Sequence, residues 1–85
     1  METKELRAAA DFNFSECRLP LIAVYQNPFD YPGKAVARLF DADQPTEQVL
    51  IRDTLQELMA ECQKMGMLFI PRDEYDDEVI VGTWI

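Results

Sequence analysis

The chain has 85 residues and a net charge of −8, which results from 16 acidic and 8 basic residues. Its hydrophobic fraction of 48% and aromatic fraction of 11% predict one small globular domain and exclude a disordered chain. Binding to nucleic acid or to an anionic membrane surface needs a positive field, so we expect neither. The chain has no histidine and no CxxC pair, which excludes zinc sites built from cysteine and histidine.

The N-terminal segment, residues 1–16, has the weakest pattern in the chain. Thr3 can cap a short helix through residues 4–10, which three consecutive alanines favour. The apolar side of such a helix is narrow, so the segment is expected to be helical or partly disordered. Residues 17–85 are expected to form a single α+β domain.

Three strands are predicted in the first half of that domain. Residues 19–25 are a short apolar run, residues 34–41 alternate between two faces, and residues 48–52 are rich in β-branched side chains. The Asn-Pro and Pro-Gly steps within residues 26–33 predict a structured loop. We expect the two aromatic side chains of this loop, Phe29 and Tyr31, to fold back onto the core.

The main helix is predicted over about residues 54–65. Asp53 is a good N-cap, and Thr54 with Glu57 forms an alternative capping box one residue later. Gly66 is placed to end the helix. The apolar positions share one helical face, and they are Leu55, Leu58, Met59, Cys62 and Met65.

Two last strands, over residues 67–70 and 79–85, are expected to pair as a hairpin, with Trp84 in the core. The element order therefore predicts an α+β fold, a small two-layer sandwich. Its antiparallel or mixed sheet should have about five strands, with one main helix and an additional N-terminal helix if residues 4–10 are helical.

The residue types of the chain offer no credible catalytic site, so we predict a protein that is not an enzyme and needs no cofactor. Histidine, the commonest general base, does not occur in the sequence. The only serine, Ser15, lies in the segment with the weakest pattern. Cys17 has only Arg18 nearby to activate its thiol, and Cys62 on the apolar helix stripe is expected to be a buried free thiol.

Residues 73–78 contain five carboxylates in a run of six residues. Such a cluster of oxygen ligands could bind Ca²⁺ or Mg²⁺, although the spacing is not that of an EF-hand loop and no glycine lies inside it. The alternative is a solvated hairpin turn. The sequence leaves both interpretations open.

Two arginines, Arg38 and Arg52, lie inside otherwise apolar strands. Each can face solvent, pair with a nearby acid (Asp41, Asp43 or Asp53), or form a basic spot on an acidic protein that a partner recognises. The candidate interaction surface combines the loop with its neighbouring strand, and its residues are Phe29, Tyr31, Lys34 and Arg38.

Five short stretches of the chain read DYPGK (30–34), RLFD (38–41), RDTL (52–55), IPRD (70–73) and GTWI (82–85). With these stretches the chain resembles a group of short uncharacterised bacterial proteins over about residues 20–85. The resemblance implies a small bacterial cytoplasmic protein of unknown function. It carries no activity and no role for any residue.

No apolar signal region follows the first residues, and no apolar run is long enough to span a membrane, so we expect a cytoplasmic protein. The first functional hypothesis is a non-enzymatic protein-interaction domain in that compartment. Its partner would be an unidentified protein or a second copy of the chain, joined at an exposed sheet edge. The second hypothesis is an acidic decoy that imitates nucleic acid and binds a basic site on another protein. The third is a small metal-binding protein or enzyme that uses the carboxylates of residues 73–78.

Overall fold

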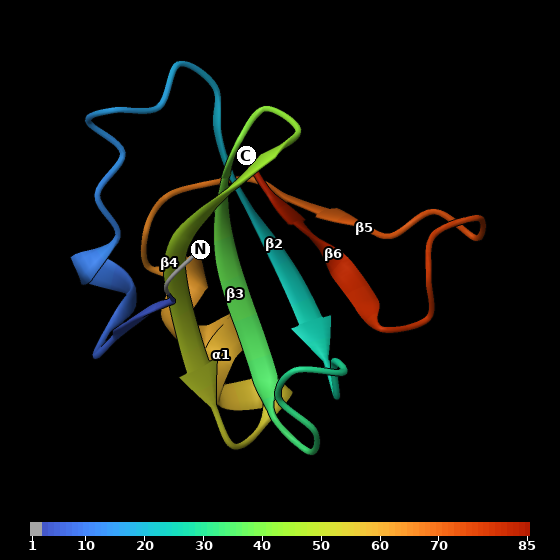
Figure 1. Ribbon diagram of the computed structural model, residues 1–85. Coiled ribbons are helices and arrows are strands. Elements are labelled where there is room, and N and C mark those ends of the chain that lie inside the picture. The colour runs from blue at the N-terminus through green and yellow to red at the C-terminus, as the bar shows by residue number, and fades with distance from the viewer. Residues whose placement is uncertain (1–2) are drawn as a thin grey trace.

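The computed structural model describes residues 3–85, which form one six-stranded sheet, one α-helix and a short 3-10 helix (Figure 1). The predicted α+β fold with one main helix is thereby confirmed. The strand order is β1-β4-β3-β2-β6-β5, and β1 is parallel to β4 while the other neighbours are antiparallel. In chain order the elements are β1 (Lys4–Leu6), η1 (Ala9–Asp11), β2 (Pro20–Gln26), β3 (Ala35–Asp41), β4 (Gln44–Arg52), α1 (Leu55–Gln63), β5 (Phe69–Pro71) and β6 (Ile80–Trp84).

The N-terminal segment differs from the expected helix over residues 4–10. Strand β1 pairs with β4, and the alanines contribute only the 3-10 turn η1. A helix of seven residues is marginal by itself, whereas β1 gains hydrogen bonds from the sheet. Leu6, Ala9 and Phe12 are buried in the same core cluster as the strands. The segment therefore completes the core.

The apolar pattern of the sequence predicts three strands in this part of the chain, and in the structure β2, β3 and β4 form an antiparallel meander. The loop expected between β3 and β4 is a tight turn instead, with Ala42 at a φ of +54°. Strand β4 accordingly begins at Gln44, earlier than residue 48. The β3–β4 register shifts between Arg38 and Phe40, where Thr46 Oγ1 donates a hydrogen bond of 2.8 Å to the Leu39 carbonyl oxygen.

Helix α1 lies behind the sheet in Figure 1, against β3 and β4. Thr54 is its N-cap, because Thr54 Oγ1 accepts a hydrogen bond of 3.2 Å from the Glu57 N–H. The alternative cap is thus the observed one, and Asp53 pairs with a lysine instead. The predicted apolar stripe faces the sheet, with Leu58 and Cys62 buried and Leu55, Met59 and Met65 packed against the core.

The two faces of the sheet are covered differently. The cluster that α1 covers includes Ile22, Val24, Ala37, Leu39 and Leu50. The side chains that alternate with these point away from α1. Within residues 3–85 no helix covers that second face, which we call the helix-free face. It includes the strand residues Ala23, Tyr25, Val36, Arg38, Phe40 and Val49.

The last two strands form the predicted antiparallel hairpin, and Trp84 is buried as expected, with 5% of its surface exposed. The ring of Phe69 lies 4.9 Å from the ring of Trp84, centroid to centroid. The same Phe69 ring lies close to the Cα position of Gly82. Among the described residues, Trp84 Nε1 is a buried donor without a hydrogen-bond partner.

Within residues 3–85, neither helix has the length and apolar character that a membrane-spanning helix needs.

Candidate functional site

The helix-free face contains a hollow of about 300 Å³ beside Arg38. Its floor comes from alternating positions of β2 and β3, and its walls come from the loop after β2 and the start of β4. Prolines and aromatic rings make up most of this surface, which a guanidinium and a carboxylate interrupt. The lining residues are Tyr25, Pro28, Asp30, Val36, Arg38, Phe40 and Pro45.

Arg38 is the cation of this hollow, and only 22% of its side chain is exposed. Its Nη2 lies 3.3 Å from Asp30 Oδ2 on the adjacent loop. A guanidinium has five N–H donors, so one long bond to Asp30 leaves donors for an incoming acceptor. Burial raises the pKa of Tyr25; Arg38 lowers that pKa, whereas Asp30 adds to the increase. Tyr25 therefore keeps its hydroxyl proton at neutral pH and can donate it in a hydrogen bond.

The loop between β2 and β3 is held by its own hydrogen bonds. Asn27, at a φ of +54°, donates its N–H to the Lys34 carbonyl oxygen at 2.8 Å, and its Oδ1 accepts from the Gly33 N–H at 2.7 Å. Gly33 has a φ of +78°, a conformation that favours glycine. In Figure 1 this loop lies at the end of the β2–β3 hairpin opposite the C-terminus. The loop is thus a braced structure that presents its tip to solvent.

The expectation that Phe29 folds back onto the core is wrong, because Phe29 is fully exposed at 105%. Pro28, one residue earlier, is buried in its place and anchors the loop. Phe29 borders a second, shallower hollow with Pro28, Pro32 and Val79. Pro28 lines both hollows, so the exposed ring and the Arg38 hollow are neighbours.

The structure brings together only part of the predicted surface. Arg38 and Phe29 border neighbouring hollows, and Tyr31 is half-buried in the loop between them. Lys34 instead forms an ion pair with Asp53 beside the start of α1. The hydrogen bond between these two side chains raises the pKa of Lys34 and lowers the pKa of Asp53. Because both groups are exposed, the pair contributes little to stability.

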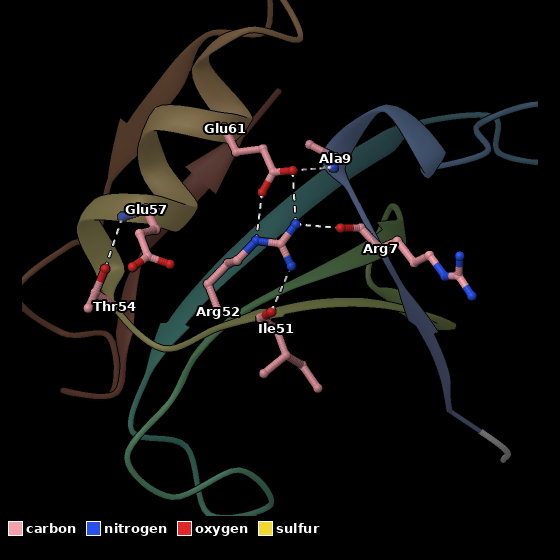
Figure 2. Close-up of polar contacts among 7 residues, drawn as sticks. All are labelled: Arg7, Ala9, Ile51, Arg52, Thr54, Glu57 and Glu61. Atoms are coloured by element: carbon pink, nitrogen blue, oxygen red, sulfur yellow. Dashed lines mark hydrogen bonds and ion pairs between the residues drawn. The ribbon is translucent and has the colours of Figure 1, made fainter.

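The second strand arginine, Arg52, has a structural environment that Figure 2 shows in full. Its Nε and Nη2 each donate a hydrogen bond of 2.9 Å to the carboxylate of Glu61 on α1. Nη2 also donates to the Arg7 carbonyl oxygen at 2.5 Å, and Nη1 donates to the Ile51 carbonyl oxygen at 2.9 Å. Glu61 Oε1 accepts a further bond of 3.1 Å from the Ala9 N–H.

This network corrects the partners expected for the strand arginines, which were Asp41, Asp43 and Asp53. Arg52 pairs with Glu61 and Arg38 pairs with Asp30. Since its donors already hold α1, β4 and the N-terminal segment together, Arg52 serves the fold and leaves Arg38 as the candidate for binding.

The acidic run of residues 73–78 folds as a self-capped turn. Asp76 Oδ2 accepts from the Asp73 N–H at 2.9 Å, and Asp73 Oδ1 accepts from the Tyr75 N–H at 3.3 Å. Asp77 Oδ1 accepts from the Val79 N–H at 3.2 Å. Within residues 3–85, no group of three or more His, Cys, Asp or Glu side chains is arranged to hold a metal ion. Three of the five carboxylates are thus used as acceptors for the turn itself.

Both cysteines are free thiols, and Cys62 is buried as predicted. Burial raises the pKa of the Cys62 thiol to about 11, with Glu61 adding to the increase and Arg52 opposing it. Burial together with Asp41 and Glu16 also raises the pKa of Cys17. A nucleophilic cysteine needs the opposite shift, so neither thiol is activated.

The buried Cys62 thiol is expected to make the protein less stable at alkaline pH. In the unfolded chain a thiol ionises near its ordinary pKa of 9.0, whereas in the folded chain it keeps its proton up to about 11. Unfolding then releases a proton, so stability falls as pH rises through this window, by on the order of 2 kcal/mol. Urea unfolding at pH 8 and pH 11 measures the fall, and Cys62→Ala should show a smaller one. Parallel pH profiles for the two proteins would contradict this expectation.

Sequence reasoning named Arg38 but missed Tyr25 and Asp30, the other polar members of the hollow. The alternation within β2 and β3 is visible in the sequence and puts Tyr25 and Arg38 on corresponding faces of their strands. The position of Asp30 depends on the loop conformation, for which the sequence has no equivalent signal.

No family model, curated protein or solved structure matches the chain. The resemblance to short bacterial proteins therefore stays a prediction.

Proposed function

We propose that this protein is a non-enzymatic protein-interaction domain of a small bacterial cytoplasmic protein. Its binding surface is formed by Phe29 on the β2–β3 loop and by the neighbouring hollow with Arg38. The observation that carries the proposal is the full exposure of Phe29 on a loop held by its own hydrogen bonds.

A fully exposed phenylalanine on a braced loop is well suited to binding. Burial of its ring against a partner removes a large apolar area from water. Because the hydrogen bonds of Asn27 already fix the loop, little conformational entropy is lost on binding. Aromatic side chains and arginines are also the residue types that most often dominate binding energy at protein interfaces.

The Arg38 hollow adds polar selectivity to the apolar anchor. A partner carboxylate or backbone carbonyl can take the free donors of the guanidinium, which is held in place by Asp30. The hollow contains Tyr25 as a further hydroxyl donor. No activated nucleophile lies among these residues, which supports binding over catalysis.

The proposal is tested by affinity capture from a lysate of the source organism. Wild type, Phe29→Ser and Arg38→Gln are compared with the control Tyr75→Ser, which removes a similarly exposed aromatic ring from the acidic turn. We expect a specific protein that wild type and Tyr75→Ser capture equally at low and high salt, and that Phe29→Ser and Arg38→Gln lose. Phe29→Ser and Tyr75→Ser, both at exposed positions, should change stability by less than about 0.5 kcal/mol.

Two outcomes would point elsewhere. Capture that Phe29→Ser and Arg38→Gln leave unchanged would remove this surface from consideration. Capture that disappears at high salt for every variant would favour the acidic decoy, because screening weakens exposed charge pairs.

A further inference from the structure

The described chain exposes six large hydrophobic side chains, and four of them gather at one end of the helix-free face. These four are between 45% and 67% exposed. We call them the apolar patch, and its residues are Leu19, Leu68, Ile70 and Ile85. Phe29 and Tyr75 are the other two and lie in separate loops.

Strand register places the patch residues side by side. Ile70 pairs with Thr83, which pairs with Ala23 on the helix-free face. Leu68 and Ile85 exchange two backbone hydrogen bonds of 2.8 Å, so they lie one step further along the same hairpin. Because side chains alternate, Leu68 and Ile85 point to the same face as Ile70.

Leu19 belongs to the same end of the sheet. Its carbonyl oxygen accepts a hydrogen bond of 2.8 Å from the Ala42 N–H, which extends the β2–β3 ladder by one residue. Alternation along β2 places Leu21 on the face of Ala23, and Leu19 lies at the bend that leads into this end of β2. The patch therefore extends across β2, β6 and β5, from the row that Ile70 shares with Ala23 and Arg38 toward the C-terminal end of β6.

The edge of β5 is poorly suited to adding a strand from another molecule. Leu68 and Arg72 both direct their N–H groups inward, to Ile85 and Val81. The outward positions of β5 are consequently Phe69 and Pro71, and proline has no N–H to donate. A partner gains more from the face of this hairpin than from its edge.

Charge restricts the kind of partner that the patch can bind. The chain carries a net charge of −8, and three of its eight cations are held in ion pairs within residues 3–85. Asp41 and Asp43 lie at the turn next to Leu19, and the carboxylates of residues 73–78 follow Arg72 in the connection from β5 to β6. A second copy would bring the same negative charge to the interface, and an anionic membrane would also be repelled.

We propose that the apolar patch binds an amphipathic segment of a partner protein whose apolar side is flanked by lysine or arginine. The inference deepens the proposed interaction function and rests on it, because it names the chemistry of one partner element. Leucine-like side chains of the segment cover the patch, and its cations meet the carboxylates of the β3–β4 turn and of the β5–β6 connection.

The test uses the full chain and a fluorescent synthetic peptide of leucine and lysine, with leucine confined to one helical side. Fluorescence anisotropy measures its Kd for wild type and for the double variant Leu68→Ser/Ile70→Ser. We expect the double variant to weaken binding at least tenfold, which corresponds to about 1.4 kcal/mol. Tyr75→Ser removes an exposed ring outside the patch and should leave the Kd within about twofold of the wild-type value. A peptide with glutamate in place of lysine should not bind.

A second pair of variants keeps the test decisive if the double variant unfolds. Leu68→Lys adds a like charge against the basic peptide, so it should weaken binding more than Leu68→Glu does. The proposal is overturned if the double variant binds as tightly as wild type, or if the glutamate peptide binds equally well. A dimer that light scattering detects and Leu68→Ser abolishes would also overturn it, with a second copy as the occupant.

The two proposals fail separately. If Leu68→Ser/Ile70→Ser binds the basic peptide as tightly as wild type while lysate capture still depends on Phe29, the basic segment is rejected and the Phe29 surface is kept. The reverse pattern would reject the Phe29 surface and keep the patch.

Discussion

Replacement of Trp84 by alanine is expected to lower the free energy of unfolding by about 3–5 kcal/mol. The side chain is 5% exposed, packs against Phe69 and closes the core beside the end of the sheet. A domain of this size has on the order of 5–10 kcal/mol of stability in total, so the loss approaches half of it or more. Trp84→Ala should therefore unfold at a much lower urea concentration than wild type.

Urea unfolding followed by circular dichroism measures this effect, because the variant has no tryptophan left for fluorescence. Trp84→Phe is the matched control. It keeps an aromatic ring next to Phe69 and removes Nε1, the buried donor that has no partner among residues 3–85. Removal of an unsatisfied donor offsets part of the lost packing, so Trp84→Phe should cost much less. If Trp84→Ala unfolds at the same urea concentration as wild type, the ring does not stabilise the core.

Gly82→Ala is expected to lower the free energy of unfolding by about 1–3 kcal/mol, although alanine is usually better than glycine within a strand. An added Cβ would lie 2.5 Å from the Ile70 carbonyl oxygen and 2.7 Å from Phe69 Cε1. The Ile70 carbonyl belongs to the backbone of the paired strand, so it cannot rotate away as a side chain can. Accommodation of the methyl group requires β5 and β6 to separate.

The same urea experiment tests Gly82→Ala, with Thr83→Ala as the control. Thr83 is the next residue of β6 and points to the helix-free face, where its truncation creates no clash. We expect Thr83→Ala to lower the free energy of unfolding much less than Gly82→Ala does. Equal stability of Gly82→Ala and wild type would show that the β5–β6 spacing adapts freely.

Short windows of sequence were sufficient to predict the elements whose hydrophobic pattern repeats over a few residues. The helix stripe through Leu58 and Cys62, the alternation in β3 and the hairpin of β5 and β6 are all visible in short windows of sequence. The same windows could not predict β1. Its partner β4 lies more than forty residues later, and a parallel pairing of three residues leaves no periodic signal.

The candidate site shows the same division between local and long-range information. Arg38 stands out in the sequence as a cation within an apolar strand, and the structure places it in a hollow. The exposure of Phe29 depends on the conformation of the loop, which buries Pro28 and in which Asn27 bonds to Gly33 and Lys34. Glu61 as the partner of Arg52 depends on where α1 crosses the sheet.

The Arg52–Glu61 network also determines the order in which the chain can assemble. Strand β1 pairs with β4, and the Ala9 N–H binds the carboxylate of Glu61, so the N-terminal segment completes its contacts only after β4 and α1 are in place. During synthesis these first residues leave the ribosome well before their partners do. Closure of this long loop then comes late, and in the folded protein the segment should be among the first parts to open in hydrogen exchange.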